Sequence, residues 1–321
     1  MREYLIVIFY GIFATFLYNY FASLLRAVGN SVVPLVFLAV SAVLNIALDL
    51  WFVVGLDRGV AGAAEATVIS QYVSGIGTAA YTFWKRPDLL PRRKNCALRM
   101  FTLREIARFS FLTCLQQSVM NLGILLVQGR VNSFGPGVMA AFAATVKIDA
   151  FAYMPVQDFG NAFSTFIAQN YGAGEKERIR RGLRGAVLTS VIFCLAVSAL
   201  VWIFARPLML LFVDAGETAI IAEGVRYLHI EGAFYCGIGC LFLFYGLYRA
   251  IGKPGISVVL TVISLGTRVA LAYLLSAIPA VGVVGIWWSV PIGWLLADLA
   301  GVLYLIGRIR REAGEKNFKK I

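Results

Sequence analysis

Apolar residues fall in nine long runs, separated by short polar or basic connections along the whole chain. Most runs reach about 20 residues, the length that an α-helix needs to cross the hydrocarbon core of a bilayer. The pattern predicts an all-α integral membrane protein, a polytopic helical bundle with about nine transmembrane helices. The predicted spans are 4–25, 32–56, 60–84, 106–133, 137–172, 184–205, 219–250, 255–277 and 283–307.

The composition supports a membrane location. Of 321 residues, 60% are hydrophobic and only 14% are charged, whereas soluble domains carry about 25% charged residues. The net charge of +12 lies in the short connections and in the tail, so we expect no nucleic-acid partner. The sequence has no Walker-type loop, zinc-binding spacing or nucleophile elbow. We therefore expect neither an enzyme nor a bound cofactor, apart from a coupling ion.

Basic residues are concentrated in alternate connections. They cluster at 85–108, at 173–184 and in the tail from residue 308, whereas the connections at 133–137 and 278–282 carry almost no charge. The positive-inside rule makes the basic connections cytoplasmic. We therefore expect a multi-pass protein of the cell inner (plasma) membrane whose C-terminus is cytoplasmic.

An internal repeat divides the chain into two lobes. The segment RAVG at 26–29 recurs as RAIG at 249–252, and GVAG at 59–62 recurs as GVVG at 282–285. Spans one to three therefore repeat spans seven to nine, and both copies enter the membrane from the same side, as in transporters with parallel repeats. The predicted divisions are a partial N-terminal lobe of three helices (1–84), a basic cytoplasmic linker (85–105), a C-terminal lobe of six helices (106–307) and a basic cytoplasmic tail (308–321).

Four segments carry a resemblance to a known family. They are RAVGNSVVP at 26–34, NIALD at 45–49, GVAGAAEAT at 59–67 and VKIDAFAYMPVQDFGNAFSTFIAQNYGAG at 146–174. In this order and spacing they resemble the MATE (multidrug and toxic compound extrusion) family over essentially the whole chain. The resemblance implies a two-lobe fold in which this chain corresponds to helices four to twelve, so we expect an incomplete first lobe.

The resemblance also implies a function. It implies a secondary active antiporter that exports drugs or organic cations, with a small cationic or amphipathic substrate, in exchange for Na⁺ or H⁺. With the first three helices absent, the chain as given is expected not to export drugs on its own. Two alternatives stay open: a lipid-linked saccharide flippase of the same broad fold group, and a gene remnant that does not transport. A flippase would have a cationic cavity for pyrophosphate, to which Lys147 and Arg268 could contribute.

A carboxylate stands inside the second apolar run. Asp49 follows Asn45 by four residues, so both lie on one helix face. An ionisable group within a span is costly to insert and is a functional candidate by default. Thr67 lies at a similar depth in the antiparallel third span, so the three residues supply hard oxygen ligands for Na⁺, or a carboxyl for H⁺. The resemblance implies the same role, because they match the first-lobe cation site of some MATE transporters; helix packing is the alternative.

Ionisable residues also occur in the predicted C-terminal lobe. Arg268 stands at the repeat position of Asn45, and an arginine within a span needs an anionic partner. We predict a polar network in this lobe, with a structural ion pair as the alternative. Its candidate members are Lys147, Asp149, Arg268, Glu231 and Asp298, and Asp158 is a further possible partner of Arg268.

Overall fold

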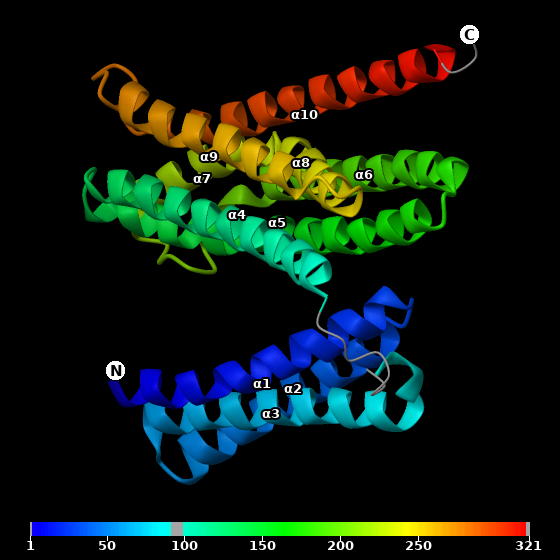
Figure 1. The fold of residues 1–321 in the computed structure, drawn as a ribbon. Coiled ribbons are helices and arrows are strands. Elements are labelled where there is room, and N and C mark those ends of the chain that lie inside the picture. The colour runs from blue at the N-terminus through cyan, green and yellow to red at the C-terminus, as the bar shows by residue number, and fades with distance from the viewer. Residues whose placement is uncertain (1, 91–98, 319–321) are drawn as a thin grey trace. The chain divides into compact units, whose positions relative to one another are not determined.

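The computed structural model describes residues 2–90 and 99–318, and every regular element in these residues is helical (Figure 1). The chain forms two compact units, Met1–Arg99 and Met100–Ile321. The predicted all-α fold class is confirmed.

The first unit contains three long helices. Its elements are α1 (Arg2–Ala27), α2 (Val32–Asp49), the π-helical segment η1 (Leu50–Gly55), α3 (Gly59–Lys85) and the short 3₁₀ segment η2 (Pro87–Leu89). The second unit has seven helices in its described residues. They are α4 (Met100–Asn132), α5 (Pro136–Gly172), α6 (Lys176–Met209), α7 (Thr218–Gly232), α8 (Tyr235–Ala250), α9 (Pro254–Ser276) and α10 (Val284–Phe318).

Most of the predicted spans are long apolar helices in the structure. Seven helices of the described part are long and apolar enough to cross a membrane, or eight spans if the bent pair α7 and α8 forms one. The polytopic membrane architecture is confirmed, and the predicted number of nine is approximate. The helix that accounts for the difference is α3, which is 27 residues long but less apolar.

The polar side of α3 is buried within the first unit. Ser70, Ser74, Thr78 and Thr82 recur every four residues along it and are all buried. Each hydroxyl donates a hydrogen bond to a carbonyl of the same helix. This side therefore packs in the interior without leaving its hydroxyl donors unpaired, although its residues lower the hydropathy of the span.

The predicted seventh span, 219–250, is not one continuous helix. It breaks between α7 and α8, whose axes differ by 51°. Hydropathy could not reveal this break, because the two helices together are apolar enough for one span and the residues between them, Ala233 and Phe234, are apolar as well. Discontinuous helices are a recurring device of transporters, where the free helix ends line a binding site.

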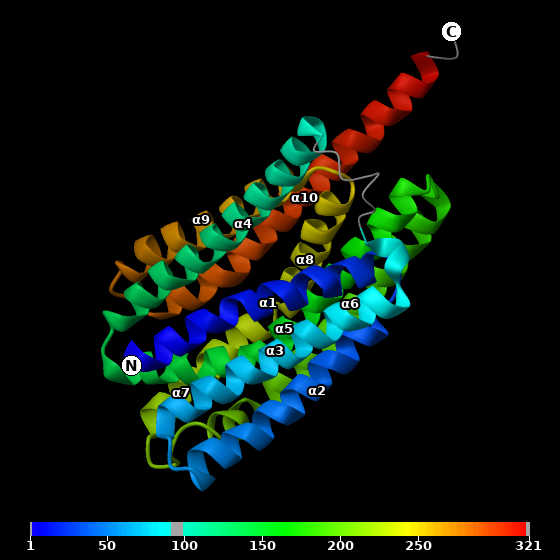
Figure 2. The same ribbon diagram turned by 60° about the horizontal axis from the view of Figure 1, so that its bottom comes forward.

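The helices of the second unit form two layers that α7 and α8 connect. In one layer α9 lies between α4 and α10 (Figure 1), and the three helices run alongside one another in Figure 2. In the other layer α5 packs against α6. The contact between α5 and α8 is a backbone contact, because a Cβ added to Gly246 would lie 2.6 Å from the Gly160 carbonyl oxygen. Small residues at such crossings let membrane helices approach closely. This approach holds the C-terminal half of α8 against α5.

Candidate functional site

The predicted cation site in the first unit lies where the helix geometry changes. The α-helical part of α2 ends at Asp49, and the chain continues as the π-helix η1. Such π segments occur frequently at functional sites. Among the described residues, neither Asp49 Oδ1 nor Asn45 Nδ2 has a hydrogen-bond partner, although both atoms are buried. Two polar groups on one face of α2 are therefore buried and unsatisfied, which native structures seldom tolerate without a reason.

Thr67 lies on α3, which packs against both α2 and η1. Its hydroxyl donates to the Ala63 carbonyl of its own helix at 3.0 Å. The hydroxyl oxygen therefore keeps its lone pairs for another partner. A carboxylate, an amide and a hydroxyl on these neighbouring helices have the donor chemistry of a site for Na⁺ or for a proton.

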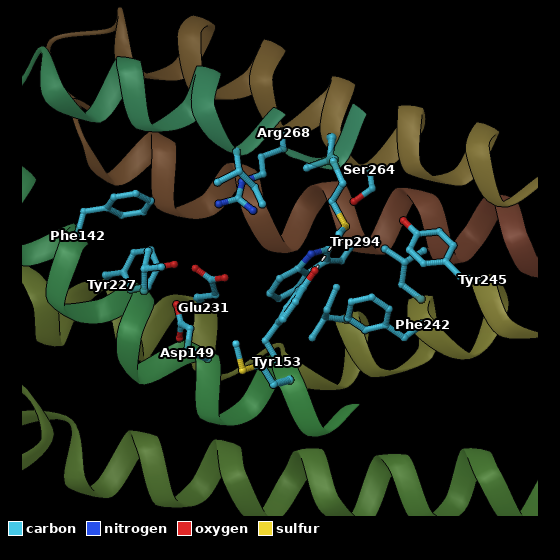
Figure 3. Close-up of a pocket in the computed structure, with 18 residues that line it drawn as sticks. Phe142, Asp149, Tyr153, Tyr227, Glu231, Phe242, Tyr245, Ser264, Arg268 and Trp294 are labelled. Carbon is cyan, nitrogen blue, oxygen red and sulfur yellow. Dashed lines mark hydrogen bonds between the residues drawn. The ribbon is translucent and has the colours of Figure 1, made fainter. Parts of the chain in front are cut away.

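The second unit contains a cavity of about 220 Å³ among α4, α5, α7, α8, α9 and α10 (Figure 3). Most of the cavity wall is apolar and aromatic. Its aromatic side chains are Phe142, Tyr153, Tyr227, Phe242, Tyr245 and Trp294. Three ionisable side chains that were predicted from the sequence line the same cavity, namely Asp149, Glu231 and Arg268.

The carboxylates of Asp149 and Glu231 both lie near the break between α7 and α8. Glu231 lies in the last turn of α7 and is only 5% exposed. Tyr235 begins α8, and its hydroxyl donates a short hydrogen bond to Asp149 Oδ1 on α5. Tyr227, one turn before Glu231, interacts with both Asp149 and Glu231. Residues on both sides of the break therefore surround Asp149.

Within the described part of the chain, Arg268 is the one basic side chain of the cavity wall. It stands on α9, and Figure 3 shows its guanidinium directed into the space that Glu231 also faces. In the described chain it forms no ion pair with any carboxylate, and its Nε atom is buried without a hydrogen-bond partner. Its charge acts on both Asp149 and Glu231 through the cavity.

The other candidates for the polar network lie elsewhere. Lys147 is exposed, and its Nζ atom lies 5.6 Å from the centre of the Phe212 ring. Asp298 lies on α10 beside Gly237 of α8, away from the cavity wall, and its Oδ1 atom has no hydrogen-bond partner in the described residues. Asp158 is exposed and does not line the cavity. The structure thus brings together Asp149, Glu231 and Arg268 only.

Several cavity residues were not identified from the sequence. Tyr227 stands four residues before Glu231, and this spacing, which places both side chains on one helix face, could have revealed it. Trp294 carried no comparable signal, because its neighbours in the cavity come from distant parts of the chain. The same holds for Tyr235, which does not line the cavity but bonds to Asp149.

The chain is similar to a known protein family and to several of its members. The MatE family profile matches residues 1–51 and 110–274. The chain is 30% identical over 306 residues to the probable multidrug resistance protein YpnP of Bacillus subtilis, covering 94% of this chain and 67% of that protein. It is 26% identical over 291 residues to the probable multidrug resistance protein NorM of Thermotoga maritima, covering 89% of this chain and 62% of that protein.

The fold is similar to solved structures of the same kind. A crystal structure of MATE in the bent conformation matches with a TM-score of 0.88 and 25% identity, covering 98% of this chain and 69% of that one. The chain therefore spans about two thirds of the length of the curated relatives that it matches.

Proposed function

Because the chain belongs to the MatE family of membrane transporters, we propose that it takes part in the export of small organic cations in exchange for Na⁺ or H⁺. Members of this family are transporters and not enzymes. In our proposal the cavity of the second unit binds the cargo, and the cluster of Asp49, Asn45 and Thr67 binds the coupling ion.

The charge of the cavity wall carries this proposal. Two carboxylates, Asp149 and Glu231, face one guanidinium, that of Arg268, so the wall is formally negative when both acids are ionised. The faces of the surrounding aromatic rings attract cations as well. A volume of about 220 Å³ is below the roughly 300–1,000 Å³ of pockets for drug-sized ligands. These features favour a small cation with an apolar or aromatic body.

The same wall argues against the flippase alternative. A pyrophosphate group requires several cationic partners. Lys147 is exposed and lies away from the cavity, and the single charge of Arg268 is outnumbered by two carboxylates. We therefore propose cation export rather than lipid-linked saccharide transport.

The coupling ion in our proposal uses the buried oxygen atoms around Asp49. Na⁺ prefers hard oxygen ligands, and a proton can occupy the same carboxylate. We further propose that the protein lies in the plasma (inner) membrane with its C-terminus in the cytoplasm. The exposed basic residues at the start of α6, including Arg178 and Arg180, support this orientation.

Transport of a permanently charged probe tests the proposal. The full chain is expressed, and gradients of Na⁺ or H⁺ are imposed on inside-out membrane vesicles. The sequence resemblance led us to expect no export by the chain on its own, but both proposed sites lie within its described residues, so we propose that it shows gradient-driven uptake of benzyltrimethylammonium. Uptake should fall at least about tenfold in Glu231→Gln because the cavity loses a charge that attracts the probe. Asp158→Asn is the matched control, since it removes an exposed acid of α5. Uptake that ignores both gradients, or equal uptake by Glu231→Gln, would contradict the proposal.

A further inference from the structure

Arg268 is a half-buried residue whose Nε atom is fully buried, and its position needs an explanation. On α9 its stem packs against α10, because a Cβ added to Gly293 would lie 3.4 Å from the Arg268 Cβ. The two helices are in close contact here, because a Cβ added to Gly293 would also lie 2.4 Å from the Ser264 carbonyl oxygen. This contact fixes the base of the Arg268 side chain. A buried arginine is costly within a membrane and is normally paired. Here the guanidinium faces two carboxylates across a cavity without an ion pair to either in the described chain.

The charge of Arg268 differs in kind from that of the two acids. A guanidinium stays protonated in proteins, whereas a carboxylate can accept a proton. Among the residues that the structure describes, no other basic side chain lines the cavity. The titratable groups on its wall are Asp149, Tyr153, Tyr227, Glu231, Tyr245 and Arg268, and Tyr235 bonds to Asp149. Helices α4 and α10 contribute only uncharged side chains.

We infer that Arg268 is a specificity-determining residue, which cancels one of the two carboxylate charges and so limits the cargo to cations with a single positive charge. This inference rests on the proposed function. With both acids ionised, the wall has a formal charge of minus one, which one monovalent cation neutralises. A divalent cation would leave an excess positive charge beside Arg268 in an apolar cavity, where like charges repel strongly.

A pair of probes of similar shape but different charge tests this inference. Benzylammonium carries one charge and para-xylylenediammonium carries two, and benzyl alcohol serves as the neutral probe. Binding to the purified full chain is measured by calorimetry in mildly alkaline buffer, in which both amines stay protonated. We expect the wild-type protein to bind benzylammonium more tightly than the other two probes.

Variants at Arg268 then separate charge from structure. Arg268→Gln should raise the affinity for the diammonium relative to benzylammonium by about tenfold or more. The substitution removes the repulsion between the guanidinium and each ammonium group, and the diammonium has two such groups. Arg268→Lys should keep the wild-type preference, since it keeps the charge. Lys147→Gln, which removes an exposed cation of α5 outside the cavity, should change nothing.

The outcomes distinguish this inference from the proposed function. If benzylammonium binds and Glu231→Gln weakens its binding, but the wild-type protein binds the diammonium equally well, the role of Arg268 is refuted while the cation site stands. An unchanged preference in folded Arg268→Gln refutes it as well. If Arg268→Gln does not fold, the wild-type preference and Arg268→Lys decide. Absence of benzylammonium binding refutes both ideas.

Discussion

Tyr153 of the cavity wall and Tyr235, which lies beside Asp149, have very different hydrogen-bond partners. The Tyr235 hydroxyl donates to the carboxylate of Asp149, whereas the Tyr153 hydroxyl contacts only the Met120 sulfur at 3.4 Å. A hydrogen bond to a charged group contributes more than one to a thioether, which is a weak acceptor. These two residues therefore offer a matched comparison at the scale of a single hydroxyl.

Tyr235→Phe should destabilise the protein by about 1.5–3 kcal/mol, because a buried carboxylate loses a hydrogen-bond donor. Tyr153→Phe should change the free energy of unfolding by less than about 0.5 kcal/mol, since it removes only the weak contact with sulfur. Thermal unfolding of the purified variants measures both effects. Equal losses of unfolding free energy in the two variants would show that the hydrogen bond to Asp149 stabilises the protein no more than the contact with sulfur does.

Asp49 provides the opposite case, an acid whose buried Oδ1 atom has no hydrogen-bond partner among the described residues. A carboxylate that served helix packing would accept hydrogen bonds, but Asp49 Oδ1 accepts none in the part of the chain that the structure describes. Asp49→Asn should therefore alter the free energy of unfolding by less than about 0.5 kcal/mol while abolishing ion-driven uptake of benzyltrimethylammonium. Glu65→Gln is the control: it removes a nearby acid that is ion-paired with Arg58, and uptake should persist. A strongly destabilised Asp49→Asn would instead assign this acid to packing.

At the scale of elements, the sequence predicted helices better than it predicted their contacts. Each long apolar run is helical in the structure, although the run at 219–250 forms two helices. Within lipid a chain satisfies its backbone groups only in closed structures such as helices. The break between α7 and α8 could not be predicted, because hydropathy shows whether a segment prefers an apolar environment and not whether its helix axis changes direction. The period of 3.6 residues did indicate that Lys147 and Asp149 point to different sides of α5, and the structure places them apart.

The cavity depends on contacts between distant segments. Asp149, Glu231 and Arg268 come from three helices, and only the packing of those helices decides which charges meet. For this reason the candidate residues could be named from the sequence, but their grouping could not. Asp298 illustrates the difference, because it is equally conspicuous in the sequence and lies outside the cavity.

The crossing of α5 and α8 holds part of this arrangement, and glycines permit it. Gly246→Ala should destabilise the protein by about 1–3 kcal/mol, because the added methyl group would push α8 away from the Gly160 carbonyl. Gly266→Ala in α9 is the matched control, since nothing lies within 4 Å of its added Cβ. There alanine should stabilise the helix by about 0.5–1 kcal/mol. Thermal unfolding compares the two, and similar values would refute the close crossing.

At the scale of the whole molecule, the proposed ion site of the first unit and the cavity wall of the second unit have the same formal charge. In our proposal the first unit holds its coupling ion on one carboxylate, Asp49. The second unit holds its cargo on a wall whose formal charge is also minus one, because Arg268 cancels one of its two acids. In this proposal each unit binds one monovalent cation, whatever the arrangement of the units in space. An exchange of one such ion for one cargo cation moves no net charge across the membrane.

The last prediction follows from this balance. In vesicles that contain the full chain, uptake of benzyltrimethylammonium driven by Na⁺ or H⁺ should not change when a membrane potential is imposed with potassium and valinomycin. Moving one net charge across 100 mV involves about 2.3 kcal/mol, so an unbalanced exchange would respond strongly to the potential. Replacing the probe with a divalent cation in Arg268→Gln should make uptake sensitive to the potential, because one coupling ion no longer balances the cargo. A wild-type rate that rises or falls with the imposed potential would show that the charges of the two units are not exchanged one for one.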